Sequence, residues 1–210
     1  MQLVLIRHAL PERIHGPAEG GPVAVGPADP ALTALGERQA ARLVAALGTG
    51  VDALYSSPLA RARATAAPLA AALGREPEIV HDLREYDADA AHYVPVHEMA
   101  ALDPTAWDRM LAGLLPASVD VPAFTARVDA ALERIIAAHP GRSTAVVVAH
   151  AGVVNAWVAH LLGIERPLAF PLDYAGITRV LAARDGRRVV RTVNETQHVA
   201  DLLDMTAGVG

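Results

Sequence analysis

The sequence contains no cysteine, and this absence excludes several chemistries at once. None of the 210 residues offers a thiol that could form a disulfide, bind zinc as a thiolate or act as a sulfur nucleophile. Because nothing in the composition marks an oxidising compartment, we expect a cytoplasmic protein.

The chain also lacks runs of basic residues and long apolar segments. Lys and Arg number 18 against 23 Asp and Glu, which gives a formal net charge of -5, and no basic stretch could follow a nucleic-acid backbone or an anionic membrane. The apolar start at residues 3–6 ends at Arg7 and is too short for a signal peptide or a membrane span. We therefore predict neither nucleic acid nor a membrane as a partner, and the oligomeric state stays open.

Motifs of several enzyme classes are missing as well. The sequence has no Gly-x-Ser-x-Gly elbow of a serine hydrolase, and it has neither a Gly-x-Gly-x-x-Gly nor a Walker loop for a nucleotide. These absences disfavour serine hydrolases and enzymes with nucleotide cofactors.

What is present is an alternation of apolar runs with segments of helical periodicity. The runs typical of buried strands occupy residues 3–6, 51–55 and 145–149. The helical segments, with caps or breakers at their ends, occupy residues 33–47, 57–73, 122–139 and 153–162. Asp185-Gly186 lies between two further apolar runs and predicts a hairpin. This pattern predicts an α/β fold, a three-layer α/β/α sandwich with a mainly parallel, mixed central sheet.

Proline and glycine refine the prediction. Ser57-Pro58 is a cap-and-first-turn signal for the second helix, and Pro68 should bend or split that helix. Residues 16–30 are too rich in Gly and Pro for regular structure and indicate a loop. Residues 84–120 indicate a lid-like excursion of small helices over one edge of a single domain that spans residues 1–210.

Two histidines stand where apolar strands end. His8 follows the first strand directly after Arg7, and His150 follows the longest apolar run. Ligands of open α/β sheets bind at the carboxyl ends of the strands, so we expect these residues to meet. A neutral imidazole is a good phosphoryl acceptor, and guanidinium groups match the phosphoryl oxygens. Arg7 and Arg61, which lies in the first turn of the second helix, are therefore candidates to hold a phosphate.

Five fragments of the sequence carry a resemblance to a known family. They are residues 5–9 (LIRHA), 32–40 (LTALGERQA), 55–66 (YSSPLARARATA), 83–85 (LRE) and 148–153 (VAHAGV). In this order and spacing they resemble the histidine phosphatase superfamily, also called the phosphoglycerate-mutase-like family, over most of the chain. The resemblance implies the phosphoglycerate-mutase-like fold. It also implies a phosphatase that needs no metal or other cofactor and acts on a small phosphate ester.

The resemblance also implies a role for each matching residue. His8 takes the phosphoryl group, Arg7, Arg61 and His150 hold its oxygens, and Glu85 is the proton donor to the leaving group. We expect a neutral His8 opposite a protonated His150, and therefore two separated pKa values. Glu85 should have a pKa raised by partial burial, because it must protonate a departing alkoxide.

The sequence departs from the family pattern at several positions. Ala9 and Ala151 stand where glycine is usual, so both turns must keep negative φ. Asp87 is an alternative proton donor. The residues that contact the rest of the substrate are not fixed by the resemblance, and the candidates near the site are Arg13, His15, Arg84, His92 and Tyr93.

We favour hydrolysis through a phosphohistidine on His8 over three alternatives. A phosphoglycerate-type mutase is the first, although the chain is shorter than cofactor-dependent mutases. The second is a catalytically silent phosphate-binding or interaction module, which the two alanines would allow although all five site residues are retained. The third is a metallohydrolase, although the sequence lacks the His-Glu-x-x-His spacing of that class. Its candidate ligands are Asp87, Asp89, His92, His97 and Glu98.

Overall fold

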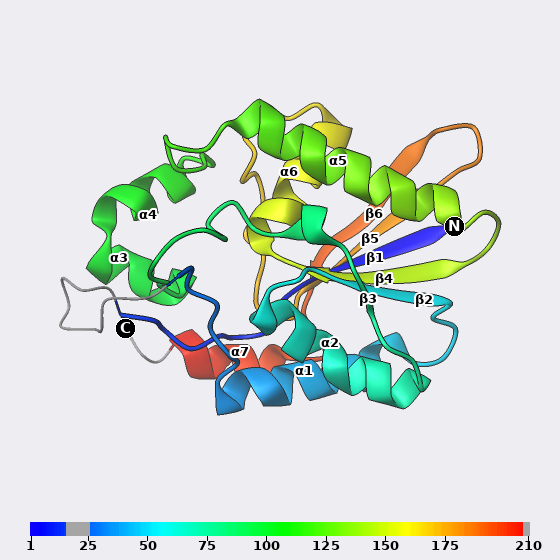
Figure 1. The fold of residues 1–210 in the computed structure, drawn as a ribbon, viewed down its shortest axis with the longest axis horizontal. Helices are drawn as coiled ribbons and strands as arrows, with labels where there is room; N and C mark the ends of the chain where they lie inside the picture. The colour runs from blue at the N-terminus through cyan, green and yellow to red at the C-terminus, as the bar shows by residue number, and fades with distance from the viewer. Residues whose placement is uncertain (16–25, 208–210) are drawn as a thin grey trace.

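The computed structural model describes residues 1–15 and 26–207, and its centre is a six-stranded mixed sheet (Figure 1). The strands are β1 (Gln2–Arg7), β2 (Ala53–Ser56), β3 (Glu78–Ile79), β4 (Thr144–Ala149), β5 (Ile177–Ala182) and β6 (Arg188–Glu195). In the sheet order β3-β2-β4-β1-β5-β6, the first four strands run parallel, whereas β5 is antiparallel to β1 and forms the predicted hairpin with β6. The predicted mainly parallel, mixed sheet is confirmed.

Helices cover both faces of this sheet. The described residues form the helices α1 (Ala34–Leu47), α2 (Ala60–Leu73), α3 (Met99–Leu102), α4 (Pro104–Leu111), α5 (Val121–Ala138), α6 (Ala151–Leu162) and α7 (Ala200–Ala207), together with the 3-10 turns η2 (His81–Leu83) and η3 (Val96–Glu98). In Figure 1, α5 and α6 lie above the sheet, and α1, α2 and α7 lie below it. The predicted three-layer sandwich is therefore confirmed.

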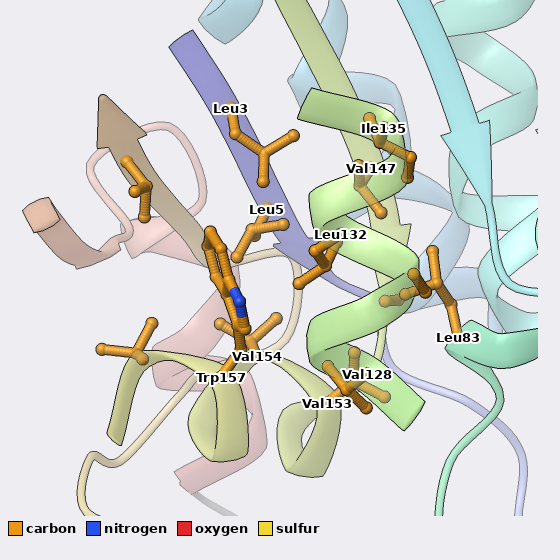
Figure 2. Packing of buried hydrophobic residues seen from close by; sticks show 14 of the residues in the cluster. Leu3, Leu5, Leu83, Val128, Leu132, Ile135, Val147, Val153, Val154 and Trp157 are labelled. Atoms are coloured by element: carbon orange, nitrogen blue, oxygen red, sulfur yellow. The ribbon is translucent and has the colours of Figure 1, made fainter. Parts of the chain in front are cut away.

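Two apolar clusters, one on each face of the sheet, hold the layers together. Val4 and Ile6 of β1 face α1 and α2, whereas Leu3 and Leu5 face α5 and α6. All four residues are buried, which makes β1 a strand covered on both faces, as its continuous apolar run predicts. Figure 2 shows the α5 and α6 side, where Trp157 packs in the core with Leu3, Leu5, Val128, Leu132, Ile135, Val147, Val153 and Val154.

Helix α2 departs from the sequence prediction at two points. It begins at Ala60 and not at Ser57, and its N-cap residue Leu59 makes no side-chain cap hydrogen bond. Instead, Ala60 N donates to both carboxylate oxygens of Asp29, at 2.8 and 2.9 Å. Of the predicted bend or split at Pro68, the split is absent, because the helix runs without a break from Ala60 to Leu73. Buried residues on both sides of Pro68 pack into the same apolar cluster, and this packing offsets the lost backbone hydrogen bond.

The excursion (residues 84–120) contains η3, α3 and α4, as the prediction of small helices requires. In Figure 1, α3 and α4 lie beyond the end of the sheet at which β1 ends. Reciprocal backbone hydrogen bonds of 3.1 Å join Tyr93 to Ile14, and an ion pair of 3.0 Å joins Glu98 to Arg13. The excursion is thus attached to the segment that follows the first strand.

Several expectations lie beyond what the structure tests. Most of the predicted loop at residues 16–30 falls outside the described residues, since positions 16–25 are not described. In the described part of the chain, no helix has the length and apolar character needed to cross a membrane. The single-domain organisation and the cytoplasmic location stay predictions, and the oligomeric state stays open.

Candidate active site

The site is built where β1 and β4 end side by side. Arg7 pairs with Ala149 in the parallel register, so that His8 and His150 are the next residues of the two neighbouring strands. Their ring centroids lie 5.3 Å apart with an interplanar angle of 60°. Both imidazoles are buried, with exposed fractions of 3% and 0%. The two histidines therefore meet, as the strand ends predicted.

His8 is held in a neutral form with a defined tautomer. Its Nδ1 lies 2.8 Å from the carbonyl oxygen of Ala9. A carbonyl oxygen only accepts, so Nδ1 carries the ring proton and Nε2 keeps its lone pair. Burial lowers the pKa of His8 well below its usual value, and the charges of Arg61 and Arg7 lower it further. This is the protonation state that a nucleophile requires.

The backbone after His8 is fixed by α1 and α2. Ala9 N donates to Thr65 Oγ1 at 2.9 Å. A Cβ at Gly36 in α1 would collide with the carbonyl oxygen of Leu10, so only glycine lets the helix approach this closely. Ala9 and Ala151 both have a negative φ, which confirms the expectation that the turns after the two histidines keep negative φ.

Two buried guanidinium groups flank the histidines. The exposed fractions are 6% for Arg7 and 1% for Arg61. Arg7 donates to the carbonyl oxygen of Leu172, and Arg61 lies 3.3 Å from Asp87 and 3.8 Å from Asp29. Among the described residues, no acceptor bonds to Nε of Arg7 or to Nε and Nη1 of Arg61. Buried cationic donors with unused N–H groups suit an anion with several oxygens, such as phosphate.

A tyrosine ring covers each of these guanidinium groups. The Cζ atom of Arg7 lies 3.8 Å from the ring centroid of Tyr174, and that of Arg61 lies 4.8 Å from the ring of Tyr93. Both tyrosines are buried. Stacking shields a guanidinium face from water and leaves its in-plane N–H groups available. Tyr93 was a candidate from the sequence, whereas Tyr174 was missed.

His150 differs from the sequence expectation. Its Nε2 lies 2.7 Å from Ser57 Oγ, and its Nδ1 makes no hydrogen bond within the described residues. Burial lowers the pKa of His150 well below its usual value, and the charge of Arg61 lowers it further. The expected protonated His150 is therefore wrong for the protein alone, because burial and the cations lower the pKa of both imidazoles. The contact with Ser57 was also missed, since the sequence indicated Ser57 as a helix cap.

Glu85 has the properties expected of a proton donor. Its carboxyl group is buried beside the start of α6, where it accepts hydrogen bonds from Gly152 N at 2.8 Å and from Tyr86 N at 3.1 Å. Burial, with a further contribution from the charge of Asp87, raises the pKa of Glu85 to about 7. A Cβ at Gly152 would collide with the carboxyl group, so glycine is required here. Glu85 therefore exchanges its proton near neutral pH.

Asp87, the alternative donor, lies in a different setting. Its Oδ1 is 3.3 Å from Nη2 of Arg61, and its side chain is 31% exposed. Burial raises the pKa of Asp87, while the charge of Arg61 and its hydrogen bond oppose that rise. A carboxylate paired with a guanidinium holds a proton less readily than one without a cation partner. The geometry therefore favours Glu85.

The remaining recognition candidates are less closely grouped. Arg13 meets Glu98 of the excursion at 3.0 Å. Arg84 is half exposed and lies 3.8 Å from the more exposed carboxylate of Asp89, and His15 and His92 are exposed. Of these four side chains, Arg13 makes an ion pair with the excursion, and the backbone bridge between Ile14 and Tyr93 places His15 and His92 at the same junction.

The ligands proposed for a metallohydrolase do not assemble. Within residues 1–15 and 26–207, no three His, Asp or Glu side chains come close enough to hold one metal ion. Glu98 instead pairs with Arg13, and Asp87 pairs with Arg61. The cluster in the excursion is thus a set of separate ion pairs.

A sequence comparison identifies the family. The model of the histidine phosphatase superfamily (branch 1) matches residues 3–196. The chain belongs to this superfamily. The resemblance that five sequence fragments carried is therefore confirmed.

Two curated proteins illustrate how far the similarity extends. A PE-PGRS family protein of Mycobacterium tuberculosis is 31% identical over 181 residues, which cover 75% of this chain but 31% of that protein. A protein of Hydrogenobacter thermophilus, whose name describes a candidate phosphoserine phosphatase, is 32% identical over 190 residues, which cover 85% of this chain and 88% of that protein. This histidine phosphatase chain thus spans less than a third of the first relative and most of the second.

Solved structures share the fold. A phosphoserine phosphatase mutant from Entamoeba histolytica, in complex with phosphoserine, has a TM-score of 0.72 and 23% identity, covering 94% of this chain and 98% of that one. The mycobacterial glucosyl-3-phosphoglycerate phosphatase has a TM-score of 0.72 and 23% identity, and the match covers 92% of this chain and 98% of that one. These likenesses confirm the predicted histidine phosphatase fold.

Proposed function

We propose that this chain hydrolyses phosphate monoesters through a phosphohistidine on Nε2 of His8. One observation carries the proposal. Two buried guanidinium groups with unused donors flank a neutral imidazole, and the hydrogen bond from its Nδ1 leaves the Nε2 lone pair as the nucleophile. Membership of the superfamily supports the same reaction class.

In the first step, Nε2 of His8 attacks the phosphorus atom and the bond from phosphorus to the leaving oxygen breaks. The N–H groups of Arg7 and Arg61 bind the phosphoryl oxygens and stabilise their charge. Glu85 gives its proton to the leaving oxygen, which departs as an alcohol. The raised pKa of Glu85, about 7, supplies this proton near neutral pH.

In the second step, a water molecule attacks the phosphorus atom of the phosphohistidine. Glu85, now a carboxylate, accepts a proton from that water as the bond from Nε2 to phosphorus breaks. Inorganic phosphate leaves, and His8 returns to its neutral form. The same carboxyl group thus serves as acid and then as base.

The proposal requires no metal or other cofactor. The positive charge that phosphoryl transfer needs comes from Arg7 and Arg61, and His150 is available as a further donor. The partner is a small phosphate ester. Phosphoserine and phosphoglycerate esters, which appear in the names of the relatives, are the first substrates to assay.

We further propose that the excursion acts as a lid in the same domain as the sheet. The main support is that Tyr93 of the excursion covers Arg61, and that Val96 N donates to the hydroxyl of Tyr174 at 3.1 Å. A segment that supplies one arginine-stacking tyrosine and contacts the other is well placed to control which leaving groups reach His8.

The proposal is tested with His8→Ala and the matched control His160→Ala, whose imidazole is exposed on α6. We expect the wild type and the control to hydrolyse an aryl phosphate equally well with and without EDTA, and His8→Ala to lose about 10⁴-fold or more in turnover. A rapid quench of the wild type should trap a phosphoryl group on the peptide that contains His8. Turnover that EDTA abolishes and that His8→Ala leaves intact would sink the proposal.

A further inference from the structure

Ser57 is placed to control the second histidine of the site. Its backbone N–H donates to Val148 O at 2.9 Å, which fixes it beside the end of β4. Its Oγ lies 2.7 Å from Nε2 of His150, and both residues have an exposed fraction of 0%. Leu59 N lies 3.4 Å from the same Oγ and donates to it. The serine hydroxyl thus lies between a backbone donor and an imidazole nitrogen.

The direction of this hydrogen bond decides what His150 can do. Neutral imidazole carries one proton, either on Nδ1 or on Nε2. Nε2 is occupied by Ser57, so Nδ1 is the one polar atom of the ring left to meet a phosphoryl oxygen, and it has no partner within the described residues. If Nε2 carried the proton, Nδ1 would present a lone pair to an anion and repel it. Only the tautomer with the proton on Nδ1 donates to phosphate.

The surroundings of Ser57 favour that tautomer. The N–H of Leu59 uses an acceptor position of Oγ, and the hydroxyl proton remains for an acceptor, which Nε2 of His150 provides. The two buried arginines nearby disfavour a second proton on the ring. A neutral His150 therefore depends on a neighbour to set where its single proton lies.

We infer that the Ser57 hydroxyl donates to Nε2 of His150 and thereby holds the ring proton on Nδ1, which binds the phosphoryl group. Ser57 is in this sense a positioning residue, because it acts through His150 and not on the substrate. The inference rests on the proposed function, to which it adds how His150 binds a phosphoryl oxygen without being charged.

The chain offers a conservative variant and a matched control. Ser57→Thr keeps the hydroxyl, whereas Ser57→Ala removes it. Ser56 is the adjacent residue, equally buried, and its Oγ donates to the carbonyl oxygen of Ser57 at 2.9 Å and not to His150. Ser56→Ala therefore reports the cost of losing a buried serine hydroxyl that does not touch the imidazole.

The first readout is the tautomer itself, which needs no substrate. The measurement is proton-coupled nitrogen NMR of protein with ¹⁵N-labelled histidine, and the His150 signals are assigned by their loss in His150→Ala. The spectra should show the proton on Nδ1 in the wild type and in Ser56→Ala. In Ser57→Ala, the proton should move to Nε2 in a large share of molecules. A wild-type His150 protonated on Nε2, or a tautomer that Ser57→Ala leaves unchanged, overturns the inference.

The second readout is catalysis. We expect Ser57→Ala to lower kcat/KM for an aryl phosphate, and the affinity for inorganic phosphate, by about tenfold or more, the scale of one donor aimed at the reacting group. Ser57→Thr should restore most of the loss, and Ser56→Ala should stay within about twofold of the wild type. Equal losses in Ser57→Ala and Ser56→Ala would contradict the inference. An inactive wild type with the expected tautomer would instead count against the proposed function alone.

Discussion

The two halves of the candidate active site are built in different ways. The phosphate half, with Arg7, His8, Arg61 and His150, comes from strand ends and the first turn of α2, and its side chains are at most 6% exposed. The leaving-group half, with Tyr93, Tyr174 and the segment 96–98, comes from loops and from the excursion. In the proposed function, the sheet thus fixes the residues of the reaction, while irregular segments surround the part of the substrate that varies.

This comparison separates two kinds of substitution effect. A change in the phosphate half should impair turnover of every phosphate ester, because each substrate presents the same phosphoryl group. A change in the leaving-group half should alter KM for some esters and leave others nearly unaffected. The predictions below begin in the first half and end in the second.

After His8, the largest effect is expected at Arg61. Arg61→Ala should lower kcat/KM for all phosphate esters by about 10³-fold, the scale measured for arginines that stabilise a transferring phosphoryl group. Arg63, two residues further along α2, is exposed, and Arg63→Ala should change kcat/KM by less than about twofold. The measurement is kcat/KM for an aryl and an alkyl phosphate. Similar losses in both variants would show that charge on α2, and not the buried guanidinium, supports turnover.

A smaller and substrate-dependent effect is expected at Glu85, the proposed proton donor. Glu85→Gln should lower kcat for an alkyl phosphate by about 10²-fold, because the alkoxide leaves without a proton. With 4-nitrophenyl phosphate, the rate of the first step should fall much less in Glu85→Gln, since that leaving group needs little protonation.

The pH profile tests the same assignment. With a pKa of about 7, Glu85 is protonated below that pH and ionised above it. Because the first step needs the protonated form, kcat for an alkyl phosphate should fall as the pH rises through about 7, and this fall should vanish in Glu85→Gln. A fall that persists in Glu85→Gln and vanishes in Asp87→Asn would identify Asp87 as the donor.

The smallest effect is expected at the Tyr174 hydroxyl. Tyr174→Phe keeps the ring on Arg7 but removes the acceptor for Val96 N, and so loosens the excursion. The loss of one hydrogen bond of about 1 kcal/mol predicts a rise of about fivefold in KM for phosphoserine, with kcat for an aryl phosphate nearly unchanged. Tyr55→Phe is the control, because the Tyr55 hydroxyl bonds to His139 and not to the excursion. A fall in kcat for every ester would place Tyr174 in the phosphate half.

The phosphate half was largely predictable from the sequence, for a physical reason. Arg7, His8 and His150 follow apolar runs, and parallel strands of one sheet end at the same edge, so their meeting follows from the pattern. Arg61 was also found, although the start of its helix was placed at Ser57 instead of Ala60. The error arose because a serine before a proline resembles a helix cap whether its hydroxyl bonds to the helix or to a distant imidazole.

The leaving-group half was less predictable because its contacts join distant segments. Tyr174 lies just before β5, and only the antiparallel pairing of β5 with β1 brings it to the carboxyl end of the parallel strands. The Asp185-Gly186 hairpin signal did not specify the direction of β5 relative to β1. The protonation of His150 was also misjudged, since its pKa depends on burial and on Arg61, which a sequence pattern does not measure.

The position of β1 has a consequence for how the protein becomes active during synthesis. β1 is synthesised before its two neighbours in the sheet, which are β4 at residues 144–149 and β5 at residues 177–182. Pairings this far apart in sequence give a high contact order, and such sheets fold slowly. Until β5 leaves the ribosome, Arg7 and His8 have no complete sheet to hold them. Chains that stop before residue 177 should therefore carry the nucleophile yet have no active site, and their exposed strand edges make them targets for chaperones.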